Sequence, residues 1–197
     1  MLENLLEYER DVFFAINGFH SQWVDYLMLA FASPWAWFPP VVVPLFFILK
    51  KHKERIMMLT CTIMAVVVNV IATEFFIKLF FTRFRPTSHP LFMEKVRVIN
   101  DYIADGDYGF ISGHSANAFA FAVLSTLVVR KKWYAISIFL WAIIMVYSRV
   151  YLGAHFITDV IPGLLFGSFV GWFLFFIYNS RKKITLNTND IGVYGNL

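Results

Sequence analysis

Five long apolar runs divide the chain, and they constrain its fold more than any other feature. The hydrocarbon core of a bilayer is about 30 Å thick, which a helix of about 20 residues can cross. Charged residues make up only 15% of the 197 residues, whereas a soluble domain has about 25%. The sequence therefore predicts an all-α membrane protein, a helical bundle with about five transmembrane helices. The expected spans cover residues 24–49, 56–81, 113–129, 133–151 and 154–178.

The segments outside these runs differ in character. Residues 2–18 predict an amphipathic helix that lies on the membrane surface. The first run has four prolines between residues 34 and 44, so we expect it to be kinked or divided into an interfacial helix and a span. The longest connection is the polar and aromatic loop 87–110. We expect residues 1–183 to form one domain, followed by a polar and mobile cytoplasmic tail over residues 184–197.

Basic residues form three clusters, which predict the orientation of the chain. The clusters lie at residues 50–55, 130–132 and 181–183. With an odd number of spans, all three fall on one side of the membrane, and short loops rich in lysine and arginine stay in the cytoplasm. We therefore expect a multi-pass protein of a bacterial inner membrane. Its N-terminus, loop 87–110 and the turn before the last run would face the outer, periplasmic side.

Three polar segments meet on this outer side, and they are suited to a phosphate. They read KLFFTRFRP, ISGHSAN and SRVYLGAHFITD. Charged side chains at membrane depth usually face a protein interior or an aqueous cavity. Arginine and lysine bind phosphate oxygens, and a helix N-terminus adds backbone N–H donors. The candidate phosphate-binding residues are Lys78, Arg85, Ser112, Gly113 and Arg149, with Arg83 and Glu74 as supporting residues.

Two histidines and an aspartate in the same segments predict covalent catalysis. His155 and Asp159 are four residues apart, so we expect them to share a helix face. The carboxylate would hold the imidazole in one tautomer, which leaves the far ring nitrogen free to attack phosphorus. His114 lies beside the phosphate-binding turn and would protonate the departing oxygen. Spacing alone leaves open which histidine attacks.

Several of these residues also admit simpler interpretations. Lys78 and Arg85 lie at the end of a span, where basic side chains often serve as interfacial anchors. Glu74 precedes Lys78 by four residues, a spacing that favours an ion pair. Arg83 is equally compatible with a phosphate ligand and with an exposed charge.

Glycines repeat every fourth residue in the last run, at Gly163, Gly167 and Gly171. Small residues at this spacing let membrane helices pack closely. We favour packing inside the bundle over a dimer interface, because the last run must hold His155 against the other segments. The expected protein is a monomer or a weak dimer.

The three polar segments resemble the signature motifs of the type 2 phosphatidic acid phosphatase family, K-x6-R-P, P-S-G-H and S-R-x5-H-x3-D. One departure is Ile111, which replaces the proline before the serine. The resemblance implies a phosphohistidine intermediate on His155, protonation of the leaving group by His114, and no metal or other cofactor. It also implies lipid phosphates or diphosphates as substrates. The matching residues are Lys78, Arg85, Pro86, Ser112, Gly113, His114, Ser148, Arg149, His155 and Asp159.

The residues do not distinguish one lipid phosphate from another. We favour undecaprenyl diphosphate or phosphatidylglycerophosphate, because outward-facing recycling suits the predicted orientation. A lipid A phosphatase of the same family is the alternative. The rival from another class is an anion transporter, against which we weigh charges gathered at one end of the spans rather than at mid-membrane. The expected partners are the bilayer and a lipid phosphate, and no nucleic acid.

Overall fold

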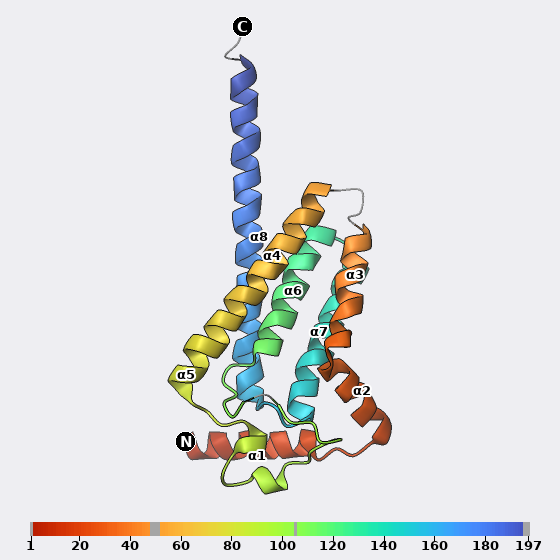
Figure 1. The fold of residues 1–197 in the computed structure, drawn as a ribbon, viewed down its shortest axis with the longest axis vertical. Coiled ribbons are helices and arrows are strands. Elements are labelled where there is room, and N and C mark those ends of the chain that lie inside the picture. Colours follow the sequence, from red (N-terminus) through yellow and green to blue (C-terminus); the bar gives the residue numbers. More distant parts are fainter. Residues whose placement is uncertain (1, 48–51, 105, 195–197) are drawn as a thin grey trace.

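The computed structural model describes residues 2–47, 52–104 and 106–194, and all regular elements among them are helical (Figure 1). This agrees with the predicted all-α bundle. The elements are α1 (Leu2–Asn17), α2 (Gln22–Ala32), η1 (Pro34–Trp37), α3 (Phe38–Phe47), α4 (His52–Val70), η2 (Ile71–Ile77), α5 (Lys78–Phe81), η3 (Pro86–Ser88), η4 (Met93–Lys95), α6 (Gly113–Val129), α7 (Lys132–Tyr151) and α8 (Ile157–Tyr194).

Three helices of the described chain are long and apolar enough to cross a membrane. They cover Ile56–Phe81, Lys132–Tyr151 and Ile157–Ser180. A bent pair made of α2 and the segment that follows it raises this number to four if it forms one span. The apolar helix α6 has 17 residues and is shorter than these spans. Length and composition therefore support three to four of the five predicted spans.

The first apolar run is broken, as its prolines predict. The axes of α2 and of residues 34–43 meet at 71°. The break falls at Ser33, whose φ of −77° and ψ of 154° are extended. A proline disfavours the helical conformation in the residue before it, and Pro34 then begins η1.

The bundle core forms where α6 packs against α4, α7 and α8 (Figure 1). The side of α6 that faces α8 carries small residues such as Ala116 and Ala120, both fully buried. A Cβ atom on Gly163 would lie 2.7 Å from the Ser112 carbonyl oxygen, and one on Gly167 would collide with the Ala116 backbone. The glycine repeat therefore packs inside the bundle, as predicted.

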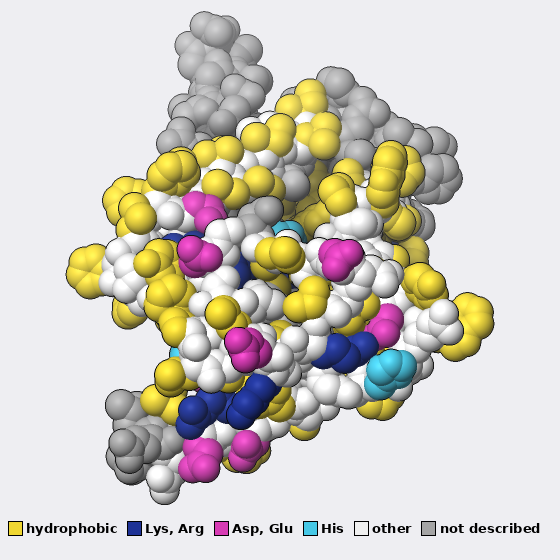
Figure 2. All heavy atoms as spheres, turned by 60° about the horizontal axis from the view of Figure 1, so that its bottom comes forward, with side chains coloured by type: hydrophobic (Ala, Val, Ile, Leu, Met, Phe, Trp, Pro, Cys, Tyr) yellow, Lys and Arg dark blue, Asp and Glu magenta, His cyan; other side chains and the backbone are white. Residues whose placement is uncertain are grey.

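The two ends of the bundle differ. At one end lie α5, loop 87–110 and the turn between α7 and α8, and α1 runs across this end (Figure 1). The turn between α6 and α7, with its basic cluster, lies at the other end. Figure 2 looks obliquely toward the α1 end, where charged side chains gather while hydrophobic side chains form the flanks. The polar segments thus meet at the end opposite the basic α6–α7 turn.

Helix α1 corresponds to the predicted amphipathic helix, but much of its apolar face packs on the protein. Phe13 is fully buried, and its ring contacts the Phe156 ring edge-on with centroids 5.3 Å apart. Phe14 makes a similar contact with Phe92 in loop 87–110. Helix α1 is therefore part of the folded domain as well as a surface helix.

The last helix is longer than predicted. The span within it ends at Ser180, close to the predicted residue 178, but the helix continues to Tyr194, where we expected a mobile tail after Lys183. Between Gly171 and Gly192 the sequence has no glycine or proline that would end a helix. Figure 1 shows this segment extending beyond the other helices. The last three residues of the expected tail, 195–197, lie outside the described residues.

Candidate active site

A cavity of about 470 Å³ opens at the α1 end of the bundle, and it brings the three polar segments together. Their side chains converge there although they come from α4–α5, α6 and the α7–α8 turn. The predicted site residues that line it are Glu74, Lys78, Arg85, Gly113, His114, Arg149 and His155. Ser112 and Asp159, both completely buried, are not among the lining residues, and neither is Arg83.

Lys78 enters the cavity from the end of the long α4–α5 helix. The seven residues before it, Ile71–Ile77, form a π-helical segment, η2, a local widening that is frequent at functional sites. Lys78 Nζ lies 2.5 Å from Glu74 Oε1, which is the predicted ion pair. Lys78 is buried, so the ion pair keeps its charge compensated at the edge of the cavity.

Arg85 lies in an extended segment after α5 that pairs with residues 107–109. Its own N–H donates to the Asp107 carbonyl, and its side chain donates to the carbonyls of Gly106 and Ala154 at 2.9 and 3.0 Å. Its Nη1 also lies 2.9 Å from His155 Nε2. These contacts fix the guanidinium beside the ring nitrogen that would attack phosphorus.

The N-terminus of α6 opens toward the same cavity. Ser112 caps the helix, because its hydroxyl accepts a hydrogen bond from the Ser115 N–H at 3.3 Å. A Cβ atom on Gly113 would lie 3.2 Å from Thr73 Oγ1, so only glycine leaves the α6 terminus open beside η2. His114 follows and is exposed to the cavity. An anion here would lie at the positive end of the α6 dipole, beside the first N–H groups of the helix.

His155 lies in the turn before α8, not on the helix face that we expected to carry both His155 and Asp159. Asp159 sits in the first helical turn, where its Oδ2 accepts the Phe156 N–H at 2.9 Å, a contact that helps to cap α8. The same Oδ2 lies 3.7 Å from His155 Nδ1, which is longer than a hydrogen bond. The predicted pair is therefore adjacent, with the carboxylate anchored by the helix terminus.

The surroundings of His155 determine where its proton resides. A guanidinium only donates, so Nε2 accepts from Arg85 and the ring proton is placed on Nδ1, toward Asp159. Burial lowers the pKa of His155 to about 4, which leaves the imidazole neutral near pH 7. A neutral ring with Nε2 unprotonated is the form that a nucleophile requires, and its lone pair becomes available for attack once the Arg85 N–H turns to another acceptor.

Arg149 reaches the cavity from the end of α7 and is almost completely buried. Its Nη1 donates to the Tyr102 hydroxyl at 3.0 Å, and its Nη2 donates to the Phe31 carbonyl at 3.2 Å. Tyr102 belongs to loop 87–110, and Phe31 to α2. The loop and the broken first run therefore hold this arginine in place.

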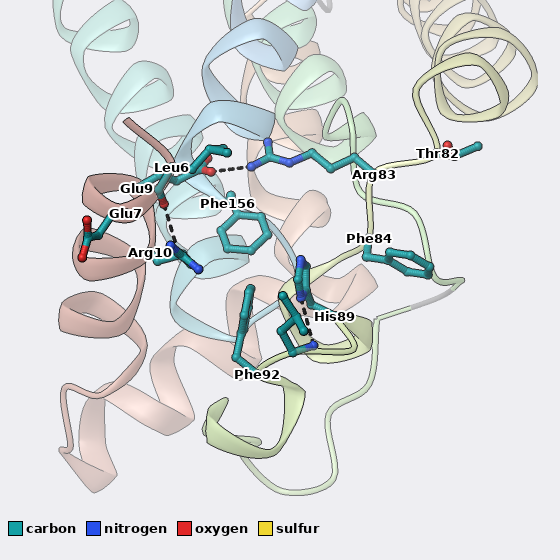
Figure 3. Close-up of a pocket in the computed structure, with 11 residues that line it drawn as sticks. Leu6, Glu7, Glu9, Arg10, Thr82, Arg83, Phe84, His89, Phe92 and Phe156 are labelled. Carbon is teal, nitrogen blue, oxygen red and sulfur yellow. Dashed lines mark hydrogen bonds and ion pairs between the residues drawn. The ribbon is translucent and has the colours of Figure 1, made fainter. Parts of the chain in front are cut away.

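Arg83 fits neither of the interpretations that its sequence position allowed. Its side chain is only 27% exposed, and it does not line the cavity of about 470 Å³. Its Nη1 donates to Asp159 Oδ1 at 2.6 Å, and its Nη2 donates to Glu9 Oε2 at 2.5 Å. Figure 3 shows Arg83 and Glu9 facing each other beside a separate cavity.

Three site residues were not identified from the sequence. Glu9 is buried against Arg83, and Tyr102 binds Arg149. A Cβ atom on Gly109 would lie 3.2 Å from Asp159 Oδ2 and 3.4 Å from His155 Nδ1. None of the three belongs to a short motif with the residue it contacts, so local sequence offered no signal.

Within residues 2–47, 52–104 and 106–194, no group of three or more His, Cys, Asp or Glu side chains is arranged to hold a metal ion. Among the Lys, Arg, Asp and Glu residues that line the cavity, three are basic, Lys78, Arg85 and Arg149, and one is acidic, Glu74. Such a set favours a phosphate over a divalent cation.

Comparison with known proteins shows a consistent resemblance. Residues 55–183 match the model of the PAP2 superfamily. The lipid A 4'-phosphatase of Porphyromonas gingivalis is 35% identical over 179 residues, which are 90% of this chain and 75% of that protein. The lipid A 4'-phosphatase of Bacteroides thetaiotaomicron is 31% identical over 183 residues, 90% of this chain and 80% of that protein. An undecaprenyl-diphosphatase of Sulfolobus acidocaldarius is 39% identical, but over 66 residues, 34% of this chain and 32% of that protein.

A solved structure gives a similar result. The crystal structure of Aquifex aeolicus LpxE superposes with a TM-score of 0.63 at 27% identity, covering 83% of this chain and 92% of that chain.

Proposed function

The chain belongs to the PAP2 superfamily, and we propose that it is a membrane phosphatase whose substrate is lipid A, from which it removes the 4' phosphate. The observation that carries this proposal is the 35% identity to a lipid A 4'-phosphatase along 90% of the chain. Our sequence analysis favoured undecaprenyl diphosphate or phosphatidylglycerophosphate, with lipid A as the alternative. The relatives support the alternative better, because the match to an undecaprenyl-diphosphatase covers only 34% of the chain.

In the proposed reaction, Nε2 of His155 attacks phosphorus while the bond from phosphorus to the sugar oxygen breaks. The departing oxygen takes a proton from His114, and the phosphoryl group stays bonded to His155. A water molecule then attacks phosphorus and gives a proton to His114, the P–N bond breaks, and inorganic phosphate leaves. Lys78, Arg85 and Arg149 stabilise the charge on the phosphoryl oxygens throughout. Each of these roles is a proposal supported by the positions of the side chains around one cavity.

The chemistry of the leaving group determines how much the reaction depends on His114 as the general acid. A sugar hydroxyl leaves as a basic alkoxide unless it is protonated, so a lipid A substrate depends on His114 more strongly than an acidic aryl group does. The position of His114 on the exposed side of the cavity would place it next to such a leaving oxygen. No step uses a metal ion, and we expect phosphate release to persist in excess chelator. Activity that is lost with chelator and restored by magnesium would contradict the histidine mechanism.

We further propose that the chain crosses the membrane five times, with the cavity on the outer face of a bacterial inner membrane. Helix α6, added to the three long helices and the bent pair, would bring the number of spans to five. Its 17 residues are about 25 Å long, which is short for a bilayer. Because α4, α7 and α8 pack against α6, this short helix is surrounded largely by protein and need not match the full thickness of the bilayer.

The substrate is tested with purified protein in detergent and a panel of lipid A, undecaprenyl diphosphate and phosphatidylglycerophosphate. We expect the highest kcat/KM for lipid A. Mass spectrometry of the product should show that the 4' phosphate is lost while the phosphate at the other end of the disaccharide remains. Efficient hydrolysis of undecaprenyl diphosphate with lipid A left intact would contradict the proposal.

A further inference from the structure

Helix α1 carries a buried carboxylate, Glu9, which faces the first turn of α8. Glu9 is only 7% exposed, although α1 lies on the surface. Burying a charge is costly unless it is paired and hydrogen-bonded. Both oxygens of Glu9 have partners, since Oε2 accepts from Arg83 Nη2 at 2.5 Å and Oε1 accepts from the Thr158 hydroxyl. Helix α1 thus contacts the first turn of α8 through polar groups as well as through its phenylalanines.

Arg83 connects this carboxylate to the one beside His155. Its Nη1 donates to Asp159 Oδ1 at 2.6 Å while its Nη2 is bonded to Glu9. The guanidinium also lies over the Phe156 ring, 4.7 Å from the ring centroid. Figure 3 shows Arg83, Glu9 and Phe156 around a cavity of about 590 Å³. This cavity shares no lining residue with the cavity of about 470 Å³ that His155 lines. Arg83 therefore acts on Asp159 from the side away from the substrate.

The two oxygens of Asp159 consequently have separate partners. Oδ1 is held by Arg83, which turns Oδ2 toward His155 Nδ1 and the Phe156 N–H. If Asp159 were the only partner of Arg83, the guanidinium would largely cancel its negative charge. Asp159 would then stabilise the positive charge that develops on the His155 ring only weakly. The carboxylate of Glu9 offsets the charge of Arg83, so the group of three keeps a net negative charge next to His155.

We infer that Glu9 is a positioning residue for the phosphoryl-transfer step, and that it acts through Arg83 on the orientation and effective charge of Asp159. This inference rests on the proposed roles of His155 and Asp159. It makes the amphipathic helix α1 a part of the catalytic machinery rather than only a membrane contact. Neither Glu9 nor Arg83 would bind the transferred phosphate itself.

The test uses the substitution Glu9→Gln, which removes the charge and keeps the shape of the side chain. The full-length protein is assayed with an aryl phosphate in detergent, and kcat and KM are measured separately. We expect kcat to fall about tenfold, because the carboxylate beside the nucleophile would be less well oriented, with KM nearly unchanged. Glu9→Asp should recover part of the rate. Glu7→Gln is the matched control, because it removes the same charge from an exposed position of α1 and should leave kcat unchanged.

A double substitution tests whether the effect passes through Arg83. If it does, Glu9→Gln should have little further effect on kcat once Arg83→Gln is present. A merely structural contact would lower the melting temperature and the yield of folded protein, while kcat per folded molecule stayed at the wild-type value. That result, or equal effects of Glu9→Gln and Glu7→Gln, would overturn the inference while leaving the proposed function intact. A wild-type protein that releases no phosphate in the same assay would overturn the proposed function and the inference with it.

Discussion

The His155–Asp159 pair has little room to move, because Gly109 packs against both side chains. The segment that carries Gly109 pairs with residues 83–85, and the Gly109 N–H donates to the Arg83 carbonyl at 2.8 Å. The same backbone contact that fixes Arg85 therefore also closes the space behind the histidine. Several site residues depend on this one short pairing of extended segments.

Substituting Gly109 should reduce catalysis without removing any catalytic group. A methyl group at this position would sit 3.2 Å from Asp159 Oδ2, so the carboxylate or the histidine must shift by a few tenths of an ångström. We expect Gly109→Ala to lower kcat about tenfold, since misplacement by about 1 Å can cost a hundredfold. Gly109→Ser should lower it further. Steady-state kinetics with an aryl phosphate would check this, and equal kcat for wild type and both variants would mean that the pair is not constrained by Gly109.

The basic residues and histidines that line the cavity of about 470 Å³ were candidates from the sequence, whereas Tyr102, which lines it too, and Glu9 were not. Lys78, Arg85, His114 and His155 lie in short segments whose spacing carries the signal. Glu9 acts on Arg83 from 74 positions away, and only the folded chain brings them together. Arg83 itself was left open between two interpretations, because its partners lie on α1 and α8 rather than in its own segment.

Among the helices, a strong hydrophobic pattern predicted the membrane spans well, whereas it did not predict how far α8 continues beyond its span. The spans over residues 56–81 and 133–151 agree with the structure within one residue at each end. The break in the first run was expected, because proline disfavours the helical backbone conformation in the residue before it. The last span ends at Ser180, two residues from the predicted end, while α8 itself continues to Tyr194 because the loss of hydrophobicity after residue 178 marks the end of a span and not the end of a helix.

The contact between α6 and α8 gives a prediction about stability. Because a Cβ atom on Gly167 would collide with the Ala116 backbone, Gly167→Ala must push the two helices apart. We expect this substitution to destabilise the bundle by about 2 kcal/mol, as other overpacked cores are. Thermal unfolding in detergent is the measurement. Leu165→Ala, at a side chain that is 62% exposed, is the control and should change stability little. Equal melting temperatures for the two variants would contradict close packing at Gly167.

A second polar cluster joins α1, α2, loop 87–110 and α7. Arg97 donates to both oxygens of Asp25 and to the carbonyls of Asn17 and Phe19. The buried Asn17 amide donates in turn to the Tyr151 carbonyl at 2.9 Å. These contacts give loop 87–110, whose role the sequence did not indicate, a structural function in fixing α1 and α2 beside the site.

For the molecule as a whole, the placement of the cavity opposite the basic α6–α7 turn leads to a topology prediction. In a background with Cys61→Ser, a cysteine at Leu91, which is 80% exposed, should react with an impermeant thiol reagent added to intact spheroplasts. A cysteine at the exposed Lys131 should react only after the membrane is permeabilised. The opposite pattern would put the cavity in the cytoplasm and remove the outer-face proposal.

The central claim is that His155 carries the phosphoryl group, and rapid-quench trapping of the phosphoenzyme tests it most directly. The wild-type protein, mixed with labelled aryl phosphate, should form an acid-labile phosphoenzyme. His155→Ala should form none and should not turn over any substrate, because Nε2 is the only proposed nucleophile. His114→Ala should still form the phosphoenzyme from an aryl phosphate, whose acidic leaving group needs little protonation, and should lose most of its activity on lipid A. A phosphoenzyme that persists in His155→Ala but is lost in His114→Ala would contradict the assignment, and full turnover by both variants would contradict the histidine mechanism itself.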